Sequence, residues 1–197
     1  MNEKAITTII LAAGFSSRMK EFKPLSVFSG KTFLENVIVK PATISREIIV
    51  VTGYKNELIE KEIAKIRENV GVPLIANYNK NFHKGMFSSI KSGVREVKTD
   101  WTLLHFVDQP SLPKEFYAEL YERISAKYDW VQPCFNGKNA HPIAIYKRAF
   151  DLILQAADTD TLKNVSLNIE NKLIYKTEFP QTLDNFNEKS AYHFANN

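Results

Sequence analysis

A short loop of small and basic residues near the N-terminus could bind an anion. Gly14, Arg18 and Lys23 follow a β-branched, apolar run at residues 6–11 with no polar linker between them. Small residues let the backbone approach a ligand, Gly14 can adopt a positive φ, and free N–H groups at such a turn attract phosphate. We expect a phosphate-binding loop in which the two cations offset negative charge. An ordinary strand-to-helix turn with two solvated cations is the alternative.

A carboxylate follows an apolar segment in the second half of the chain. Asp108 comes directly after residues 101–107, which read as a buried strand. A carboxylate at such a place is costly unless it is exposed, caps a turn or binds a cation. Asp108 is therefore either a cation ligand or a turn residue before Pro110.

Strand-like and helix-like segments alternate along the whole chain. We expect strands at 6–11, 47–53, 72–76, 101–107, 130–135, 142–146 and 173–179, and helices at 32–38, 56–69, 87–97, 113–127, 150–156 and 162–170. This alternation predicts an α/β fold, a Rossmann-like three-layer sandwich with a mostly parallel central sheet and helices on both faces. Ligands of such sheets bind at the carboxyl ends of the strands, so the Gly14 loop, Gly53 and Asp108 should share one edge.

Length and composition predict a single domain, residues 1–197, in the cytoplasm. No apolar run reaches the roughly 18 residues of a membrane span, and the first residues lack a signal-peptide pattern. The only cysteine, Cys134, excludes disulfides within the chain and is expected to be a buried structural thiol. The formal charge of +4 suits an anionic small molecule, and without a dense basic run we expect neither a nucleic acid nor a membrane as a partner.

Two familiar nucleotide motifs are absent from the sequence. Gly30, Lys31 and Thr32 look like the end of a P-loop, but position 25 is leucine and no buried strand precedes them. They read instead as a turn before a helix. The seven glycines form no GxGxxG pattern, so a dinucleotide-binding Rossmann site is not supported.

Several motifs, taken in order, resemble a known enzyme family. LAAGFSSRM at 11–19, KPL at 23–25 and DQP at 108–110 are similar to motifs of the nucleotidyltransferase superfamily that includes the molybdenum cofactor cytidylyl- and guanylyltransferases. Three further segments resemble the cytidylyltransferase group: NKNFHKGMFSSIKSG at 79–93, AHP at 140–142 and NFN at 185–187. The resemblance covers nearly the whole chain.

The resemblance implies a role for each motif. Arg18 and Lys23 would stabilise charge on the reacting phosphates, and Asp108 would bind the cofactor Mg²⁺. Asn187, or else Asn185, would be a second metal ligand, although either could simply cap the last helix. The nucleotide-binding residues would be Leu11, Ala12, Ala13, Gly14, Gly53, Gly85, Met86 and Ser88. His141 would face the acceptor, with a structural histidine as the alternative.

The implied activity is Mg²⁺-dependent transfer of CMP from CTP to the terminal phosphate of molybdopterin, with release of pyrophosphate. CTP is expected rather than GTP, because Ala-Ala-Gly resembles the CTP users and Ala13 in place of glycine narrows the space beside the base. A molybdoenzyme or its chaperone would be the protein partner. The alternatives are transfer to another small phosphate, such as a sugar or polyol phosphate, and a non-catalytic nucleotide- or cofactor-binding protein.

Some positions depart from the family pattern. Lys20 stands where the family has glycine, Val107 where it has a small residue, and Ala140 where it has glycine. These departures leave every charged group of the motifs in place. Lys20 could alter the loop, and Val107 could crowd the metal site.

Overall fold

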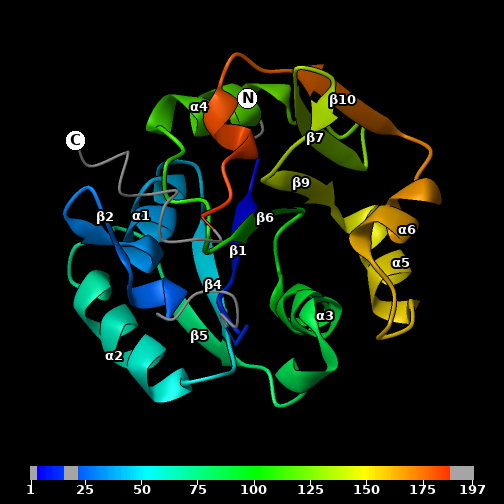
Figure 1. Cartoon of the computed structure of the whole chain (residues 1–197). Coiled ribbons are helices and arrows are strands. Elements are labelled where there is room, and N and C mark those ends of the chain that lie inside the picture. The colour runs from blue at the N-terminus through cyan, green and yellow to red at the C-terminus, as the bar shows by residue number, and fades with distance from the viewer. Residues whose placement is uncertain (1–3, 16–21, 187–197) are drawn as a thin grey trace.

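A computed structural model describes residues 4–15 and 22–186 of the chain (Figure 1). The strands are β1 (Ile6–Leu11), β2 (Val27–Phe28), β3 (Lys31–Thr32), β4 (Glu47–Thr52), β5 (Leu74–Tyr78), β6 (Trp101–Phe106), β7 (Trp130–Phe135), β8 (Lys138–Asn139), β9 (Ile143–Tyr146) and β10 (Lys172–Lys176). The helices are α1 (Phe33–Val39), α2 (Asn56–Arg67), α3 (Met86–Glu96), α4 (Lys114–Arg123), α5 (Phe150–Gln155) and α6 (Leu162–Leu167). None of these helices is long and apolar enough to cross a membrane.

The central sheet has 8 strands in the order β10-β7-β9-β6-β1-β4-β5, with β8 paired to β7. Strand β1 is parallel to β4 and β6, β4 is parallel to β5, and β10 is parallel to β7. Strand β9 runs antiparallel to both β6 and β7. Residues 136–142 between β7 and β9 are too few for a parallel crossover, which needs a dozen or more residues. The mostly parallel sheet predicted from the sequence is confirmed.

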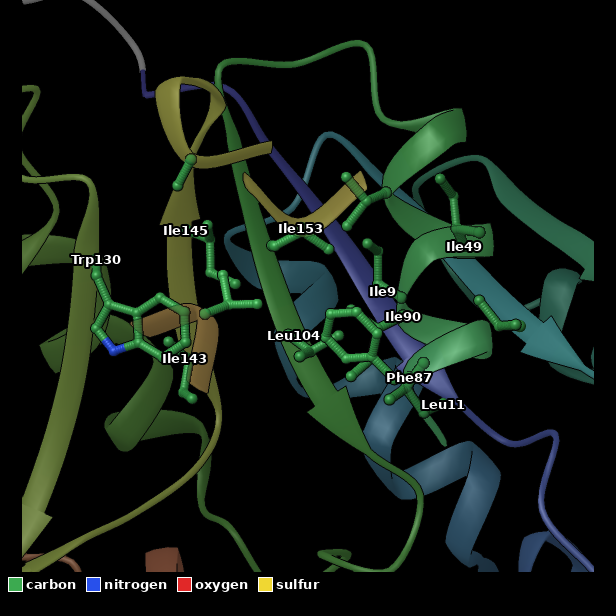
Figure 2. Close-up of a cluster of buried hydrophobic side chains, with 14 of the residues drawn as sticks. Ile9, Leu11, Ile49, Phe87, Ile90, Leu104, Trp130, Ile143, Ile145 and Ile153 are labelled. Atoms are coloured by element: carbon green, nitrogen blue, oxygen red, sulfur yellow. The ribbon is translucent and has the colours of Figure 1, made fainter. Parts of the chain in front are cut away.

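Helices cover both faces of this sheet, because alternate residues of its buried strands point to opposite sides. Ile9 and Leu11 of β1 pack with Phe87 and Ile90 of α3, in a cluster that also takes in α5 and α6 (Figure 2). Ile10, between them, packs into the cluster formed by α1 and α2 on the other face. Helix α4 forms a third apolar cluster with β6, β7 and β9. The predicted three-layer arrangement is therefore also confirmed.

The turn before α1 supports the rejection of a P-loop. Gly30 has φ of 77° in the short β2–β3 hairpin, and Thr32 then caps the first turn of α1 by accepting a hydrogen bond from the backbone N–H of Glu35 at 3.0 Å. The cap satisfies an N–H group that a phosphate would otherwise contact. This segment is a turn and a helix start, as predicted.

Some local predictions were wrong. Helix α4 ends at Arg123 rather than at residue 127, because Ile124 is extended and packs into the core. Apolar character alone does not identify the inner face of α2: Leu58 is 40% exposed, whereas the next residue, Ile59, is fully buried. Cys134 is only partly buried, since it lies near the end of β7.

Candidate active site

The carboxyl ends of β1, β4 and β6 meet at one edge of the sheet. Leu11, the last residue of β1, pairs in register with Val51 of β4 and with Phe106 of β6. The chain beyond β1 stays attached to this edge, because the Ala12 N–H donates to the Val51 carbonyl at 3.0 Å. The loops that contain Gly14 and Asp108 therefore begin side by side.

A cavity of about 170 Å³ opens at this edge; we call it the first cavity. Its lining residues are Leu11, Ala12, Ala13, Gly14, Lys23, Pro24, Phe82, Met86, Ser89, Phe106, Val107 and Asp108. The backbone after β1 forms one wall, and Lys23 with Asp108 brings charge to an otherwise largely apolar surface. Main-chain N–H groups beside a cation suit an anionic ligand.

Gly14 contributes open space to this wall rather than an unusual backbone conformation. A Cβ atom added at Gly14 would meet nothing within 4 Å. The glycines with positive φ in the described residues are Gly30, Gly85 and Gly137, so the positive φ considered for Gly14 is not adopted. The absence of a side chain leaves the backbone at Gly14 open to close approach by a ligand.

Lys23 and Asp108, which both line the first cavity, form an ion pair. The Nζ atom of Lys23 lies 3.2 Å from Oδ2 of Asp108, and both side chains are mostly buried. Lys23 begins a short 3₁₀ turn, Lys23–Leu25, in which Pro24 fixes the backbone. The Asp108 carbonyl accepts a hydrogen bond from the Phe186 N–H at 3.1 Å, which ties the loop after β6 to the C-terminal part of the chain.

A second cavity, of about 280 Å³, shares Met86, Phe106 and Asp108 with the first. Its other lining residues are Gln109, Asn139, Ala140, His141, Thr182, Leu183, Asp184 and Asn185. Because Asp108 lines both cavities, ligands in the two cavities would meet at this residue.

His141 brings a neutral imidazole to the second cavity. Its ring packs edge-on against Phe106 with centroids 4.6 Å apart, and burial lowers its pKa to about 4. Its Nδ1 atom is buried and has no hydrogen-bond partner among the described residues. His141 is therefore uncharged near neutral pH, and its Nδ1 atom makes no hydrogen bond to the described part of the chain.

Three of the predicted nucleotide-binding residues, Gly53, Gly85 and Ser88, line neither cavity. A Cβ added at Gly53 would lie 2.6 Å from Cβ of Phe82. Gly85 precedes α3 with φ of 107°. Ser88 is buried and accepts a hydrogen bond from Asn79 Nδ2 at 3.0 Å.

Of the remaining predictions, Arg18, Asn187 and Lys20 lie outside the described residues. Asn185, the alternative metal ligand, lines the second cavity. Val107 lines the first cavity beside Asp108.

The sequence interpretation missed several lining residues. Ser89 lines the first cavity, whereas the adjacent Ser88 does not. Gln109 was part of a quoted motif but was given no role; its Nε2 donates to the Thr182 and Asp184 carbonyls at 3.1 and 3.3 Å. The position of Gln109 directly after Asp108 was the available signal.

The donor set at Asp108 fits a hard divalent cation. No cluster of three or more His, Cys, Asp or Glu side chains capable of holding a metal is present in the described residues. Mg²⁺ needs no such cluster, since it binds through one or two carboxylates and keeps water and phosphate oxygens as its other ligands. Asp108 offers one carboxylate, and Asn185, whose side chain carries an amide oxygen, is among the residues that line the second cavity.

Comparison with known proteins identifies relatives of the chain. The MobA-like NTP transferase domain matches residues 8–171. Probable molybdenum cofactor guanylyltransferases of Bacillus cereus (strain AH187) and Bacillus anthracis (strain CDC 684 / NRRL 3495) are both 30% identical, over 139 and 138 residues. Each alignment covers 70% of this chain and 66% of the relative, so the chain spans slightly less than two thirds of those proteins.

Solved structures share the fold. Rv0371c from Mycobacterium tuberculosis H37Rv superposes with a TM-score of 0.75 at 16% identity, over 98% of this chain and 99% of that one. A molybdopterin-guanine dinucleotide biosynthesis protein A from Archaeoglobus fulgidus gives a TM-score of 0.68 at 19% identity, over 96% of each chain. The fold and the match over residues 8–171 agree, and the chain belongs to the MobA-like NTP transferase domain family.

Proposed function

We propose that the chain is a Mg²⁺-dependent nucleotidyltransferase that transfers a nucleoside monophosphate from an NTP to the terminal phosphate of molybdopterin. The observation that carries the proposal is the position of the Lys23–Asp108 ion pair, because Asp108 lines both cavities. The first cavity would take the NTP and the second the acceptor. Membership of the MobA-like family and the names of the Bacillus relatives support the acceptor class. The product would pass to a molybdoenzyme or its chaperone.

In the proposed reaction, an oxygen of the acceptor phosphate forms a bond to the α-phosphorus of the NTP. The bond from that phosphorus to the oxygen bridging the α- and β-phosphates breaks, and pyrophosphate leaves with the electron pair. Such transfers depend on positioning and on stabilising negative charge. N–H groups around Gly14 would hold the phosphates, and Lys23 would contact the oxygens that gain charge. Arg18 is proposed to add a second cation.

Asp108 would hold the metal at the boundary between the two substrates. A bound Mg²⁺ supplies positive charge that neutralises phosphate oxygens and orients them for in-line displacement. Rv0371c has a structure in complex with manganese, which supports a divalent cation as the cofactor class. Asn187, or Asn185 at the second cavity, would provide a further oxygen ligand.

Two observations point to different bases. The alanine at position 13 is nearly buried in the wall of the first cavity, and its methyl group favours the smaller pyrimidine of CTP. The relatives are named guanylyltransferases, which favours GTP. We retain CTP as the proposed donor and GTP as the second candidate.

The deciding experiment is pyrophosphate release by the purified protein. Mg²⁺ and molybdenum-bound molybdopterin are supplied with each of the four NTPs in turn, and the dinucleotide product is identified by mass. Release with CTP supports the proposal in full, and release with GTP alone reverses the base assignment.

Binding measurements separate the remaining alternatives. If an NTP binds saturably but no acceptor leads to pyrophosphate release, the proposed enzymatic activity is contradicted. That result would favour a non-catalytic nucleotide-binding protein. Release with a sugar or polyol phosphate, but not with molybdopterin, would overturn the acceptor assignment. Calorimetric titration of each NTP alongside the assay distinguishes these outcomes.

A further inference from the structure

The ring of Tyr54 contacts two aromatic side chains that flank the opening motif. Its centroid lies 5.3 Å from that of Phe15 and 6.0 Å from that of Phe22. Phe15 directly follows Gly14, and Phe22 directly precedes Lys23. Since Gly14 and Lys23 both line the first cavity, a single ring links the chain on two of its walls.

Tyr54 is itself anchored to the sheet edge. Its backbone N–H donates to the Ala13 carbonyl at 3.1 Å, which fixes the chain beside Gly14. Strand β4 ends at Thr52 and α2 begins at Asn56, so two regular elements hold the short turn that carries Tyr54. A residue on such a turn can keep its neighbours in place because its own backbone is constrained.

The next residue adds a cation to the same aromatic group. Lys55 has φ of 53°, a left-handed conformation that is uncommon for a residue with a side chain. Its Nζ atom lies 5.4 Å from the ring centroids of both Phe22 and Tyr54. A cation over aromatic rings is attracted to them, so the unusual backbone conformation coincides with an additional contact between Tyr54 and Phe22.

A fourth ring connects this group to the first cavity. Phe82, which lines that cavity, lies 5.2 Å from Phe15 between ring centroids. Phe15 is about half exposed, whereas Tyr54 is partly buried beneath it. Tyr54 lines neither cavity, so any effect on a ligand must pass through these neighbours.

We propose that Tyr54 is a positioning residue that fixes the Gly14 wall of the first cavity relative to Lys23. This inference rests on the proposed function, because it assumes that an NTP contacts both walls. The phosphates must meet the main chain at Gly14 and the amine of Lys23 at the same time. A displacement of about 1 Å in such an arrangement can lower the rate about 100-fold.

The test compares Tyr54→Ala with Tyr54→Phe. Calorimetry measures the dissociation constants of CTP and GTP with Mg²⁺, and pyrophosphate release gives kcat and KM. Tyr54→Ala is expected to weaken NTP binding and to lower kcat/KM by about 10- to 100-fold. Tyr54→Phe keeps the ring contacts with Phe15 and Phe22 and should stay within about threefold of the wild type.

Tyr146→Ala is the matched control. Tyr146 is also partly buried, packs on Trp101 with ring centroids 4.9 Å apart, and has Lys147 Nζ at 5.9 Å from its centroid. It lies at the opposite edge of the sheet, because Trp101 begins β6. Its loss should lower the thermal midpoint to a similar extent and leave NTP affinity and kcat/KM unchanged.

Three results would overturn the inference. In the first, Tyr54→Ala binds and turns over NTP like the wild type. In the second, Tyr146→Ala loses as much NTP affinity as Tyr54→Ala, so that the effect reflects stability alone. In the third, Tyr54→Phe is as impaired as Tyr54→Ala, so that the ring contacts are not the cause. If the wild type binds no NTP, the proposed function fails together with the inference, and that result is distinct from all three.

Discussion

The amine of Lys23 lies 3.2 Å from the carboxylate of Asp108, although the two residues are 85 positions apart in the chain. The contact joins the turn after the opening motif to the end of β6. Both side chains are mostly buried, and the ion pair brings their opposite charges together there. A divalent cation that binds Asp108 must therefore compete with the lysine.

Replacing Lys23 with alanine should strengthen metal binding by the protein without nucleotide. The Asp108 carboxylate loses its competing cation, and Mn²⁺, used as a probe, should bind at least about 10-fold more tightly, or about 1.4 kcal/mol. Electron paramagnetic resonance of free Mn²⁺ measures this affinity directly. Lys147→Ala is the control, since it removes the amine of another Lys–Asp pair, with Asp100 at 2.8 Å. Unchanged or weaker Mn²⁺ binding by Lys23→Ala would contradict the competition.

Asp108→Asn should lower the rate of pyrophosphate release by about 100-fold or more. The amide keeps the size of the side chain but removes the negative charge proposed to bind Mg²⁺, and loss of one preorganised group typically costs about 10²- to 10³-fold. Steady-state rates over a range of Mg²⁺ concentrations test this. Asp100→Asn, in the exposed pair with Lys147, should behave like the wild type. A normal rate of pyrophosphate release by Asp108→Asn would contradict the proposal that this carboxylate binds Mg²⁺.

His105 is a neutral, fully buried histidine at the end of β6. Its Nδ1 lies 2.8 Å from the Phe106 carbonyl, which can only accept, so Nδ1 carries the proton. Nε2 then accepts a hydrogen bond from the Tyr117 hydroxyl at 2.7 Å. Burial lowers the pKa of His105 to about 4, as it does for His141. Protonation would add an unpaired charge to the core.

The free energy of unfolding should therefore fall as the pH drops from about 6.5 to 4. The pKa of His105 and of His141 is near 4 in the folded protein and about 6.5 in the unfolded chain, so the unfolded chain binds more protons in this range. The contribution of these histidines to the free energy of unfolding is fully present above pH 6.5. As the pH falls toward 4, each histidine lowers the free energy of unfolding by up to about 1.4 kcal/mol per pH unit. Urea unfolding at pH 7.5 and 5.0 measures the difference.

Because carboxylates also titrate at low pH, the prediction concerns the difference between variants. His141→Gln should lose less stability than the wild type between pH 7.5 and 5.0, since it removes one of the two titrating imidazoles. His83→Gln is the control, because His83 is exposed, and it should match the wild type. An equal pH dependence in all three proteins would show that burial does not lower the pKa of His141.

The fold was predictable because the lengths and spacing of the apolar runs indicate which segments form the buried strands and which form the helices. Strands β1, β4 and β6 are buried on both faces, as strands inside a parallel sheet must be, and the sequence predicted them at 6–11, 47–53 and 101–107. The same topology brought the segments after these strands to one edge. What remained hidden was the direction of β9, which depends on the short connection at 136–142.

The candidate site was less predictable, because tertiary contacts choose among equivalent residues. Ser88 and Ser89 are adjacent, and Asn79 Nδ2 donates to the hydroxyl of each at 3.0 Å. Only Ser89 lines the first cavity, whereas the Ser88 hydroxyl lies 2.8 Å from two carbonyl oxygens of the preceding turn. Asp184 and Asn185, which line the second cavity, follow a short 3₁₀ turn with no periodic pattern. Their position depends on hydrogen bonds to distant residues, such as that of Asp184 with Ser111 at 2.7 Å.

Gly14→Ala should weaken NTP binding without changing the fold. An added Cβ meets no atom within 4 Å, so the backbone can keep its conformation. The methyl group would occupy space at the wall where phosphates are proposed to approach the main chain, and we expect about a 10-fold weaker NTP affinity. Gly71→Ala is the control, since a Cβ there also meets nothing within 4 Å. Equal NTP affinity in the two variants would place the phosphates away from Gly14.

Gly53→Ala should impair both stability and NTP binding, although Gly53 lines neither cavity. Its Cβ would lie 2.6 Å from Cβ of Phe82 and 2.8 Å from the Ala13 carbonyl oxygen, distances that force both neighbours to move. Since Phe82 and Ala13 line the first cavity, the shift changes its shape. Overpacking of this kind costs about 1–3 kcal/mol, which urea unfolding would detect, while calorimetry follows NTP affinity. If Gly53→Ala matches Gly71→Ala in both measurements, the backbone at Ala13 accommodates the methyl group and Gly53 has no role in shaping the cavity.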